Sequence, residues 1–485
     1  MTKIFKRVLI IFIILLNSCA ASALTRAEFL ARLLESRGID WSESKEFANN
    51  NGAHFMLRTG YITDQVNNLT GNITRREALR WVIQSLGLSF EADLLNDYPT
   101  GFKDSGKLNN FERGCLVIAV NMTPAIIAKS ENFRGNEALS NKDAEIILSR
   151  VKEASSNLRL DIIRNPLKGL RVFIHREGVP TGVPGWRVYA DNLSDKSIAE
   201  SLKKSFKAHG FDMKSAKSNG LYLLRSERLE DYNQVRKLVN LIKSRGLKSR
   251  VLPSMSNPNM NIAPRFWVMM TIDPTYWKIS PVFSQNGPKE LWTLSQIARH
   301  NRAKAAINAG FFAVTTIGHG FPIGALKVNN ELINNPYEGR GCLGWNDDDE
   351  AIFSVASQEA AYWVDMENII QAGPLILDEG VPVYNSNNEG FNNSLISVRH
   401  PRSAIGLNQD GQWVFMVVDG RNGFHSSGAT IAELADIMRS QNVLYALNLD
   451  GGGSSEIIIN GKIYNSISEG KERIISYALG VIALE

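Results

Sequence analysis

The stretch Ala446-Leu-Asn-Leu-Asp-Gly-Gly-Gly-Ser-Ser455 decides how the last part of this 485-residue chain folds. Apolar residues on both sides of Asn448 predict a buried strand that delivers Asn448 and Asp450 near its end. Gly451, Gly452 and Gly453 then carry no side chains, so a ligand could approach the backbone closely. A plain hairpin turn needs only two residues such as Asp-Gly. We therefore predict a binding site at this turn, with hydroxyl groups from Ser454 and Ser455.

A helix predicted at residues 431–440 follows a second polar stretch, Val417-Val-Asp-Gly-Arg421. Thr430 and Glu433 form a capping box, so the helix begins just after a glycine-containing loop. Its free N–H groups and positive dipole end would suit a phosphate, and Arg421 or His425 could add donors. The alternative is a capped amphipathic helix with a flexible loop before it.

Two further stretches place polar groups beside predicted strands. Arg399-His-Pro-Arg402 sets two guanidinium groups three residues apart, and Ala306-Ile-Asn308 is a short strand ending in an amide and a glycine turn. The sequence contains no serine nucleophile elbow, His-Glu-x-x-His, Walker loop or paired-cysteine motif. Seven scattered histidines do not indicate a zinc site. Carboxylates and arginines are therefore the expected chemical groups.

These stretches together resemble the phosphodiester glycosidase family over nearly all of residues 262–485. The resemblance implies the family's fold and its reaction class, hydrolysis of the C1–O bond of a sugar-1-phosphodiester. The motifs that carry it are Asn308–Phe312, Gly373-Pro374, Arg402–Gly406, Asp419–Arg421 and Asn448–Ser455, with later features at Asn465 and Arg473.

The resemblance also suggests roles for side chains. Asp450 and Asp419 would lie near the sugar, one of them as base or nucleophile, because a phosphate leaving group needs little help from an acid. Asn308, Asn448 and Ser454 would position hydroxyl groups. Cationic groups and N–H donors would hold the phosphate, namely Arg399, Arg402, Arg421, Arg473 and the start of the 431–440 helix.

Alternatives to these roles stay open. Either aspartate could instead ligate a divalent cation, and Glu472 or His425 could be the acid or base. No other cofactor is expected.

Upstream of a turn-rich linker, Pro253–Asn259, residues 183–253 alternate strand and helix patterns in the order β-α-β-α-β. This predicts a small open sheet with helices on one face. The segment resembles a SPOR-type module, which implies that it binds peptidoglycan. A structural spacer is the alternative.

Residues 24–158 read as helical and repetitive. Thr25-Arg-Ala-Glu28 and Thr74-Arg-Arg-Glu77 are capping boxes that open amphipathic runs, and Ser140-Asn-Lys-Asp143 is a degenerate third copy. The repeats resemble S-layer homology repeats, which implies that Arg26 and Arg75 contact an anionic wall glycan. The alternative is that these residues are only caps and a solvated face.

The first 23 residues predict export. Lys3, Lys6 and Arg7 precede an apolar run to Leu16, and Ala21-Ser-Ala23 fits a cleavage site. The run is too short to remain as a membrane-spanning helix. Alternatively, Leu16-Asn-Ser-Cys19 is a lipobox and Cys19 carries lipid. Either way we expect the cell envelope or periplasm.

Bulk composition narrows the partners. The net charge of +5 includes those three cations, so the remaining chain carries about +2, too little to indicate nucleic acid. Cys115 and Cys342 are too few for a disulfide framework and are expected to be buried small apolar residues.

The sequence thus predicts a multidomain chain: signal peptide 1–23, all-α repeats 24–158, a βαβαβ module 183–253, and a sheet-dominated α+β catalytic domain 262–485. We expect an exported phosphodiester glycosidase acting on an envelope glycan. A non-catalytic wall-polymer-binding protein and a metal-dependent phosphodiesterase are the alternatives.

Overall fold

The computed structural model describes residues 24–218, 221–255, 263–315, 318–346, 350–356, 363, 365–384 and 389–484. The predicted signal peptide, with Cys19, and most of the predicted linker lie outside these residues. The chain divides into two compact units: unit 1 comprises residues 1–159 and 181–183, and unit 2 comprises residues 160–180 and 184–485. Each unit is described by itself. No helix of the described residues is both long and apolar enough to cross a membrane.

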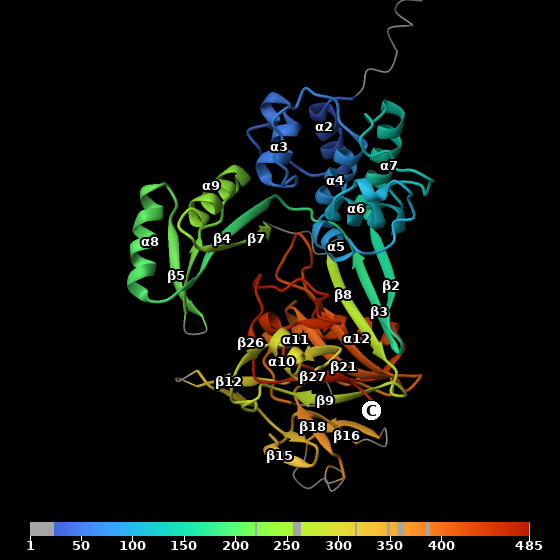
Figure 1. Cartoon of the computed structure of the whole chain (residues 1–485), viewed down its shortest axis with the longest axis vertical. Helices are drawn as coiled ribbons and strands as arrows, with labels where there is room; N and C mark the ends of the chain where they lie inside the picture. Colours follow the sequence, from blue (N-terminus) through green and yellow to red (C-terminus); the bar gives the residue numbers. More distant parts are fainter. Residues whose placement is uncertain are drawn as a thin grey trace, which may run out of the picture. The chain divides into compact units, whose positions relative to one another are not determined.

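Unit 1 is built mainly from helices, drawn in blue and cyan in Figure 1. Thr25 and Thr74 each cap a helix and accept the backbone N–H of the glutamate three residues later, whose carboxylate returns the bond. Both predicted capping boxes are therefore confirmed. The helices are α2 (Arg26–Arg37), α3 (Gly52–Thr59), α4 (Arg75–Ser85), α5 (Ser89–Leu94), α6 (Asn110–Asn121) and α7 (Asn141–Asn157).

The arginines of the repeats pair from one helix to the next. Arg26, at the start of α2, ion-pairs with Glu77 of the α4 capping box at 2.9 Å. Arg75, at the start of α4, pairs in the same way with Asp143, the third residue of α7, at 2.6 Å. Each guanidinium thus contacts the first turn of the helix that opens the next repeat, and each is about a quarter exposed or less.

Unit 1 is not all-α. It contains the short strand β1 (Met122–Thr123) and two isolated β-bridges, Thr25 with Asn72 and Thr74 with Ala138. Each bridge pairs the residue before a helix with an extended segment further along the chain. The predicted fold class is therefore wrong: the chain is a mixed α/β protein with several antiparallel sheets. Capping signals reveal helices, but short bridges leave no periodic pattern.

The main sheet of unit 2 has the strand order β2-β3-β8-β22-β21-β23-β19-β20. Its first two strands lie between the predicted helical repeats and the predicted βαβαβ module, in a segment for which no element is predicted. The strands are β2 (Arg159–Leu167), β3 (Leu170–Glu177), β8 (Arg265–Ile272), β19 (Leu375–Asp378), β20 (Val381–Pro382), β21 (Arg402–Asn408), β22 (Trp413–Val418) and β23 (Val443–Asn448).

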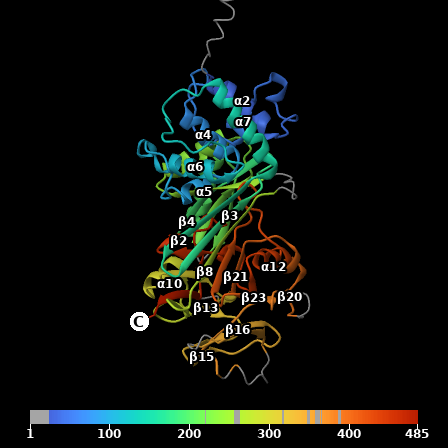
Figure 2. The same cartoon turned by 90° about the vertical axis from the view of Figure 1, so that its right-hand side faces the viewer.

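One helix, α12 (Ile431–Ser440), covers this sheet, as Figure 2 shows. Its buried Leu434, Ala435 and Met438 pack against strand residues such as Met416 and Ala446. The helix has the bounds that the sequence predicts, since its capping box and apolar face agree.

Further antiparallel strands complete the C-terminal part of unit 2. One sheet, in the order β25-β24-β11-β27-β9, packs against helix α10 (Leu294–His300), and a second has the order β15-β14-β18-β16-β17. The strands of the first are β9 (Trp277–Val282), β11 (Ala305–Asn308), β24 (Ile457–Ile459), β25 (Lys462–Ile463) and β27 (Ala478–Ala483). Those of the second are β14 (Leu326–Val328), β15 (Glu331–Asn334), β16 (Gly341–Trp345), β17 (Ala351–Val355) and β18 (Asn368–Gln371). Small elements are β10 (Trp292–Thr293), β12 (Phe312–Val314), β13 (Gly320–Pro322), α11 (Asn393–Ser397) and β26 (Ile474–Ile475).

The middle module has one strand more than predicted. Its order along the chain is β-α-β-β-α-β, and its sheet has the order β5-β6-β4-β7. The missed strand β5 is an edge strand of sequence Met-Lys-Ser-Ala-Lys-Ser, whose polar residues give no apolar signal. The elements are β4 (Pro184–Leu193), α8 (Lys196–Ala208), β5 (Met213–Ser218), β6 (Leu221–Ser226), α9 (Tyr232–Lys243) and β7 (Lys248–Met255).

Candidate active site

Three neighbouring strands of the main sheet bring the predicted site residues to one end. Arg402, at the start of β21, pairs with Val418 at the end of β22. Two residues further on, Ala404 pairs with Asn448 at the end of β23. Because neighbouring antiparallel strands run in opposite directions, the start of one meets the ends of the other two. The segments around residues 402, 419 and 450 therefore converge.

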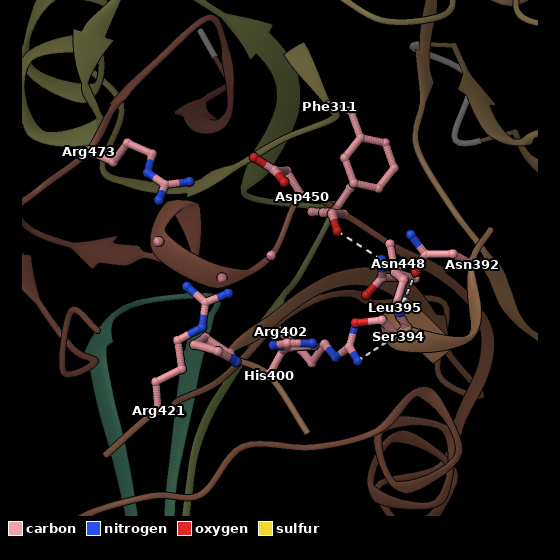
Figure 3. A pocket seen from close by; sticks show the side chains of 15 residues that line it. Phe311, Asn392, Ser394, Leu395, His400, Arg402, Arg421, Asn448, Asp450 and Arg473 are labelled. Carbon is pink, nitrogen blue, oxygen red and sulfur yellow. Dashed lines mark hydrogen bonds between the residues drawn. The ribbon is translucent and has the colours of Figure 1, made fainter. Parts of the chain in front are cut away.

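A pocket of about 310 Å³ opens at this end of the sheet. Its size is at the lower end of the range for ligand pockets, about 300–1,000 Å³. Eight of the residues predicted for the site line the pocket, and Figure 3 shows the side chains of those that are not glycines around it. These eight are Arg402, Arg421, Asn448, Asp450, Gly451, Gly452, Gly453 and Arg473.

Asp450 supplies the carboxylate of the pocket. It follows β23, and its backbone is fixed because its N–H donates to the Ala309 carbonyl at 2.9 Å. Loss of surrounding water raises the pKa of its carboxyl group to about 6, although Ser454 and Arg473 act to lower it. A carboxyl group with a pKa near neutrality can exchange a proton during a reaction.

Arg402 brings a nearly fully buried positive charge to the pocket. Burial and the neighbouring Arg421 lower its pKa to about 10. No carboxylate of the described residues hydrogen-bonds to it, because its guanidinium donates to the backbone carbonyl oxygens of Leu395, Val398 and Ala429. Its charge is therefore left to attract an anion.

Arg421 is an exposed second cation at the same pocket, and among the described residues it has no ion-pair partner. Its backbone adopts a φ of 60°, a left-handed conformation that non-glycine residues seldom take. This conformation places its guanidinium beside Gly452, where a Cβ would lie 3.0 Å from Nη2.

The glycines of the turn make room for arginines as well as for a ligand. A Cβ on Gly453 would overlap the guanidinium of Arg473. Arg473 is held by an ion pair with Glu469 and donates to the Ser454 hydroxyl at 3.4 Å. The absence of side chains along this turn thus lets cations approach Asp450 closely.

Seven lining residues were missed as site residues. His400 stands between two predicted arginines, so its position in the sequence could have marked it. Burial, Arg402 and Arg421 lower the pKa of His400, which favours the neutral imidazole. The other six are Phe311, Asn392, Ser394, Leu395, Pro401 and Leu449, of which Phe311, Pro401 and Leu449 belong to stretches named above.

Asp419 and His425 lie beside this pocket but do not line it. The Asp419 carboxylate accepts hydrogen bonds from His425 Nε2 at 2.8 Å, Ser466 N at 2.7 Å and Asn465 Nδ2 at 3.0 Å. Asp419, His425 and Asn465 are buried, and Ser466 is partly buried. Asp419 thus ties the 420–426 loop to the 465–466 segment, rather than facing a sugar.

Asn308 and the serines also act behind the pocket surface. Asn308 donates to the Asp450 carbonyl at 2.6 Å and accepts from Ser403 Oγ at 2.7 Å and Glu456 N at 3.1 Å. It thereby joins β11, β21 and the glycine turn. Ser454 and Ser455 are buried, and neither lines the pocket.

Asn448 differs from Asn308 because it lines the pocket. Its Nδ2 donates to the Gly373 carbonyl at 2.7 Å and to the Leu449 carbonyl at 2.9 Å. Its buried Oδ1 has no hydrogen-bond partner among the described atoms. An amide oxygen fixed in this way can accept a hydrogen bond from a ligand.

The N-terminus of α12 does not reach the pocket. Thr430 and Glu433 satisfy it internally, and none of these residues lines the cavity. Arg399 also lies outside it, because its guanidinium forms an ion pair with Glu433. The expected role of this helix and of Arg399 in binding phosphate therefore has no support in the geometry.

Glu472 also lies outside the pocket, where it forms a carboxyl pair with Glu456. It caps helix α10 by accepting the Ser295 N–H at 2.9 Å, and it hydrogen-bonds to Glu456. Burial and the nearby Glu472 raise the pKa of Glu456 to about 9. Glu456 is therefore protonated at neutral pH and can donate to Glu472.

The described part of the chain was predicted to hold either a metal site or none, and to hold two buried cysteines. There, no group of three or more His, Cys, Asp or Glu side chains is arranged to hold a metal ion. Cys115 and Cys342 are buried free thiols, which confirms their prediction as small core residues.

The C-terminal part of the chain is similar to known proteins. Residues 301–482 match the family model described as phosphodiester glycosidase. A prophage-derived uncharacterized protein, YomE, of Bacillus subtilis is 28% identical over 41% of this chain and 30% of its own length. The N-acetylglucosamine-1-phosphodiester alpha-N-acetylglucosaminidase of Bos taurus is 25% identical over 40% of this chain and 39% of its own.

A crystal structure from Burkholderia pseudomallei is 15% identical, covers 68% of this chain and 97% of that chain, and superposes with a TM-score of 0.46. The chain spans only about a third of the length of the curated relatives it matches. By sequence, residues 301–482 resemble a phosphodiester glycosidase domain.

Proposed function

We propose that this chain hydrolyses the bond between C1 of a sugar and a phosphate oxygen in a sugar-1-phosphodiester. The observation that carries the proposal is the pocket that Asp450 lines together with Arg402, Arg421 and Arg473 (Figure 3). Cations suit the phosphate, and one carboxylate with a pKa of about 6 suits the attack at C1.

The arginines stabilise the departing phosphate. When the C1–O bond breaks, its electron pair stays on the phosphate oxygen and the phosphate monoester gains negative charge. Arg402 is already oriented by backbone carbonyl groups, so it needs little reorganisation to meet that charge. A phosphate leaves readily without a proton, and a second carboxyl group acting as an acid is therefore dispensable.

Asp450 acts as the general base in this mechanism. Its carboxylate accepts a proton from a water molecule while the water oxygen bonds to C1, opposite the departing phosphate. The anomeric configuration is inverted, because a single displacement takes place. Asn448 Oδ1 accepts a hydrogen bond from a sugar hydroxyl and orients the ring.

The substrate class follows from the named relatives. Three of them, from cattle, mouse and human, are N-acetylglucosamine-1-phosphodiester alpha-N-acetylglucosaminidases. We therefore propose an N-acetylglucosamine-1-phosphodiester as the first substrate to test, with a phosphate-linked envelope glycan as its source.

Replacing Asp450 tests the assignment. We expect Asp450→Asn to lower kcat by at least about a hundredfold, the usual contribution of a general base. Asp436→Asn, which removes an exposed carboxylate from α12, is the matched control and should retain activity. Full turnover by a correctly folded Asp450→Asn protein would refute the role of Asp450.

Hydrolysis in ¹⁸O-labelled water separates this reaction from attack at phosphorus. The proposal requires the label in the C1 hydroxyl of the released sugar. Label in the phosphate, with loss of turnover in chelator, would instead favour a metal-dependent phosphodiesterase.

We also propose that the chain is exported to the cell envelope, where unit 1 and residues 183–253 act as wall-binding modules. Support comes from the apolar N-terminal run and from the repeated Thr-Arg-x-Glu motif. Arg26 and Arg75 are already paired with carboxylates, so an anionic glycan would have to compete with Glu77 and Asp143. Sedimentation of the mature full chain with purified cell walls, with and without Arg26→Ala and Arg75→Ala, tests this role.

A further inference from the structure

A row of side chains leads from the pocket to the protein surface. Phe311, which lines the pocket, lies 5.9 Å from Phe391 between ring centroids. The guanidinium carbon of Arg340 lies 4.2 Å from the centre of the Phe391 ring and 5.1 Å from that of Tyr337. We call these four residues, Phe311, Phe391, Arg340 and Tyr337, the aromatic row.

The outer end of the row is exposed and yet fixed. Tyr337 is 57% exposed, so burial of its ring contributes little to folding. Its backbone, however, is held on both sides by the buried side chain of Gln371. The Tyr337 N–H donates to Gln371 Oε1 at 2.7 Å, and Gln371 Nε2 donates to the Tyr337 carbonyl at 2.6 Å. A ring held in water on a fixed backbone is preorganised for contact.

The row starts on the side of the pocket opposite Arg421 and Arg473. In Figure 3, Phe311 and Asn392 lie on one side of Asp450, and Arg473 and Arg421 lie on the other. Under the proposed function, the phosphate occupies the side of Arg421 and Arg473. The sugar then occupies the side of Phe311, and the row continues outward from it.

We infer that the aromatic row is a second sugar-binding subsite, which takes the sugar next to the one being released. The natural substrate would then be an oligosaccharide-1-phosphodiester rather than a single sugar on phosphate. The C–H faces of a pyranose ring pack well on aromatic rings, and Arg340 offers N–H donors to hydroxyl groups. Continuity with the pocket favours part of the same substrate as the occupant. The inference rests on the proposed function.

Two synthetic substrates test it: methyl phosphodiesters of N-acetylglucosamine 1-phosphate and of the corresponding disaccharide 1-phosphate. We expect the wild-type protein to favour the disaccharide in kcat/KM by about tenfold, the size of one aromatic contact. Tyr337→Ala should abolish this preference, and Tyr337→Phe should preserve it because the ring remains.

Tyr276→Ala is the matched control. Tyr276 is also an exposed aromatic residue, at 39%, but it packs beside Lys168 and does not line the pocket. This variant should keep the wild-type preference. Equal kcat/KM for both substrates in the wild type, or an equal loss for both in Tyr337→Ala, would overturn the subsite.

Failure of the catalytic proposal can be recognised separately. If the wild type hydrolyses neither substrate, the catalytic proposal fails, while binding of the free disaccharide still tests the row. Saturation-transfer NMR should then show contact with the outer sugar in the wild type and its loss in Tyr337→Ala. Unchanged transfer in that variant would refute the inference.

Discussion

Two aspartates, each followed by glycine, have different environments in this protein. Asp419 accepts three hydrogen bonds from protein groups, whereas Asp450 lines the pocket near Arg473. The sequence presents both as the end of an apolar strand, so it predicts two equivalent candidates. Only the positions of His425, Asn465 and Ser466 distinguish the structural carboxylate from the one available to a ligand.

The pKa of Asp450 sets the expected pH dependence of catalysis. A general base must be ionised, so kcat/KM should rise with pH through about 6 and then level off. Arg473 lowers this pKa, and Arg473→Met should therefore move the midpoint to higher pH. A pH–rate profile with a sugar-1-phosphodiester measures both. A flat profile between about pH 4 and 8 would contradict the role.

The same pKa has a consequence for stability. The pKa of Asp450 is raised in the folded state, so its protonated form contributes stability at low pH, which is lost as pH rises through about 6. At neutral pH, burying the ionised carboxylate of Asp450 destabilises the fold, and Asp450→Asn removes this destabilisation. We expect that variant to have a higher Tm than the wild type at pH 7 and no such advantage at pH 4. Thermal unfolding at the two pH values checks the sign.

At the scale of elements, α12 shows how far a local signal reaches. Its bounds are predictable because Thr430, Glu433 and the apolar face all agree. The role of the helix is not predictable in this way. A capping box indicates where a helix begins, but it does not indicate which residues lie beside the N-terminus. Glu433 turns out to bind Arg265 and Arg399, which withdraws Arg399 from the pocket. Strand β5 shows the converse, since a polar edge strand has structure without an apolar pattern.

Removing the cap of α12 should weaken unit 2. Thr430 Oγ1 accepts the Glu433 N–H at 3.1 Å, and Thr430→Ala should cost about 1 kcal/mol of unfolding free energy. Thr430→Ser keeps the hydroxyl group and should cost much less. Urea denaturation monitored by circular dichroism measures the difference. Equal stability of the alanine and serine variants would show that the cap contributes nothing.

At the scale of the whole molecule, each unit has its own buried core. Phe29 and Trp81 are buried in unit 1, while Met416 and Leu434 belong to the core of unit 2. In the sequence, the change from helical repeats to short strands predicts a boundary near residue 158. It does not reveal that residues 160–180 belong with unit 2, because pairing of β3 with β8 joins segments about ninety residues apart.

We expect two unfolding transitions in calorimetry. Phe29→Ala should lower the midpoint temperature of the unit 1 transition only. The loss of unfolding free energy should be that typical of a buried phenylalanine, about 3–5 kcal/mol. Thr430→Ala should lower only the other transition. Displacement of both transitions by either substitution would mean that the units unfold together.

The pairing of arginines in unit 1 also constrains how this architecture can grow. Each ion pair joins the first residue of one repeat's opening helix to the third residue of the next repeat's opening helix. A duplicated repeat would therefore find an ion-pair partner in both neighbouring repeats. Asn141 interrupts that succession, since it stands where the cation stood in the two earlier copies. A fourth copy inserted after α7 would follow a helix whose first residue has no guanidinium, so the ion pair to it could not form. A copy inserted between α2 and α4 could form the ion pairs on both sides.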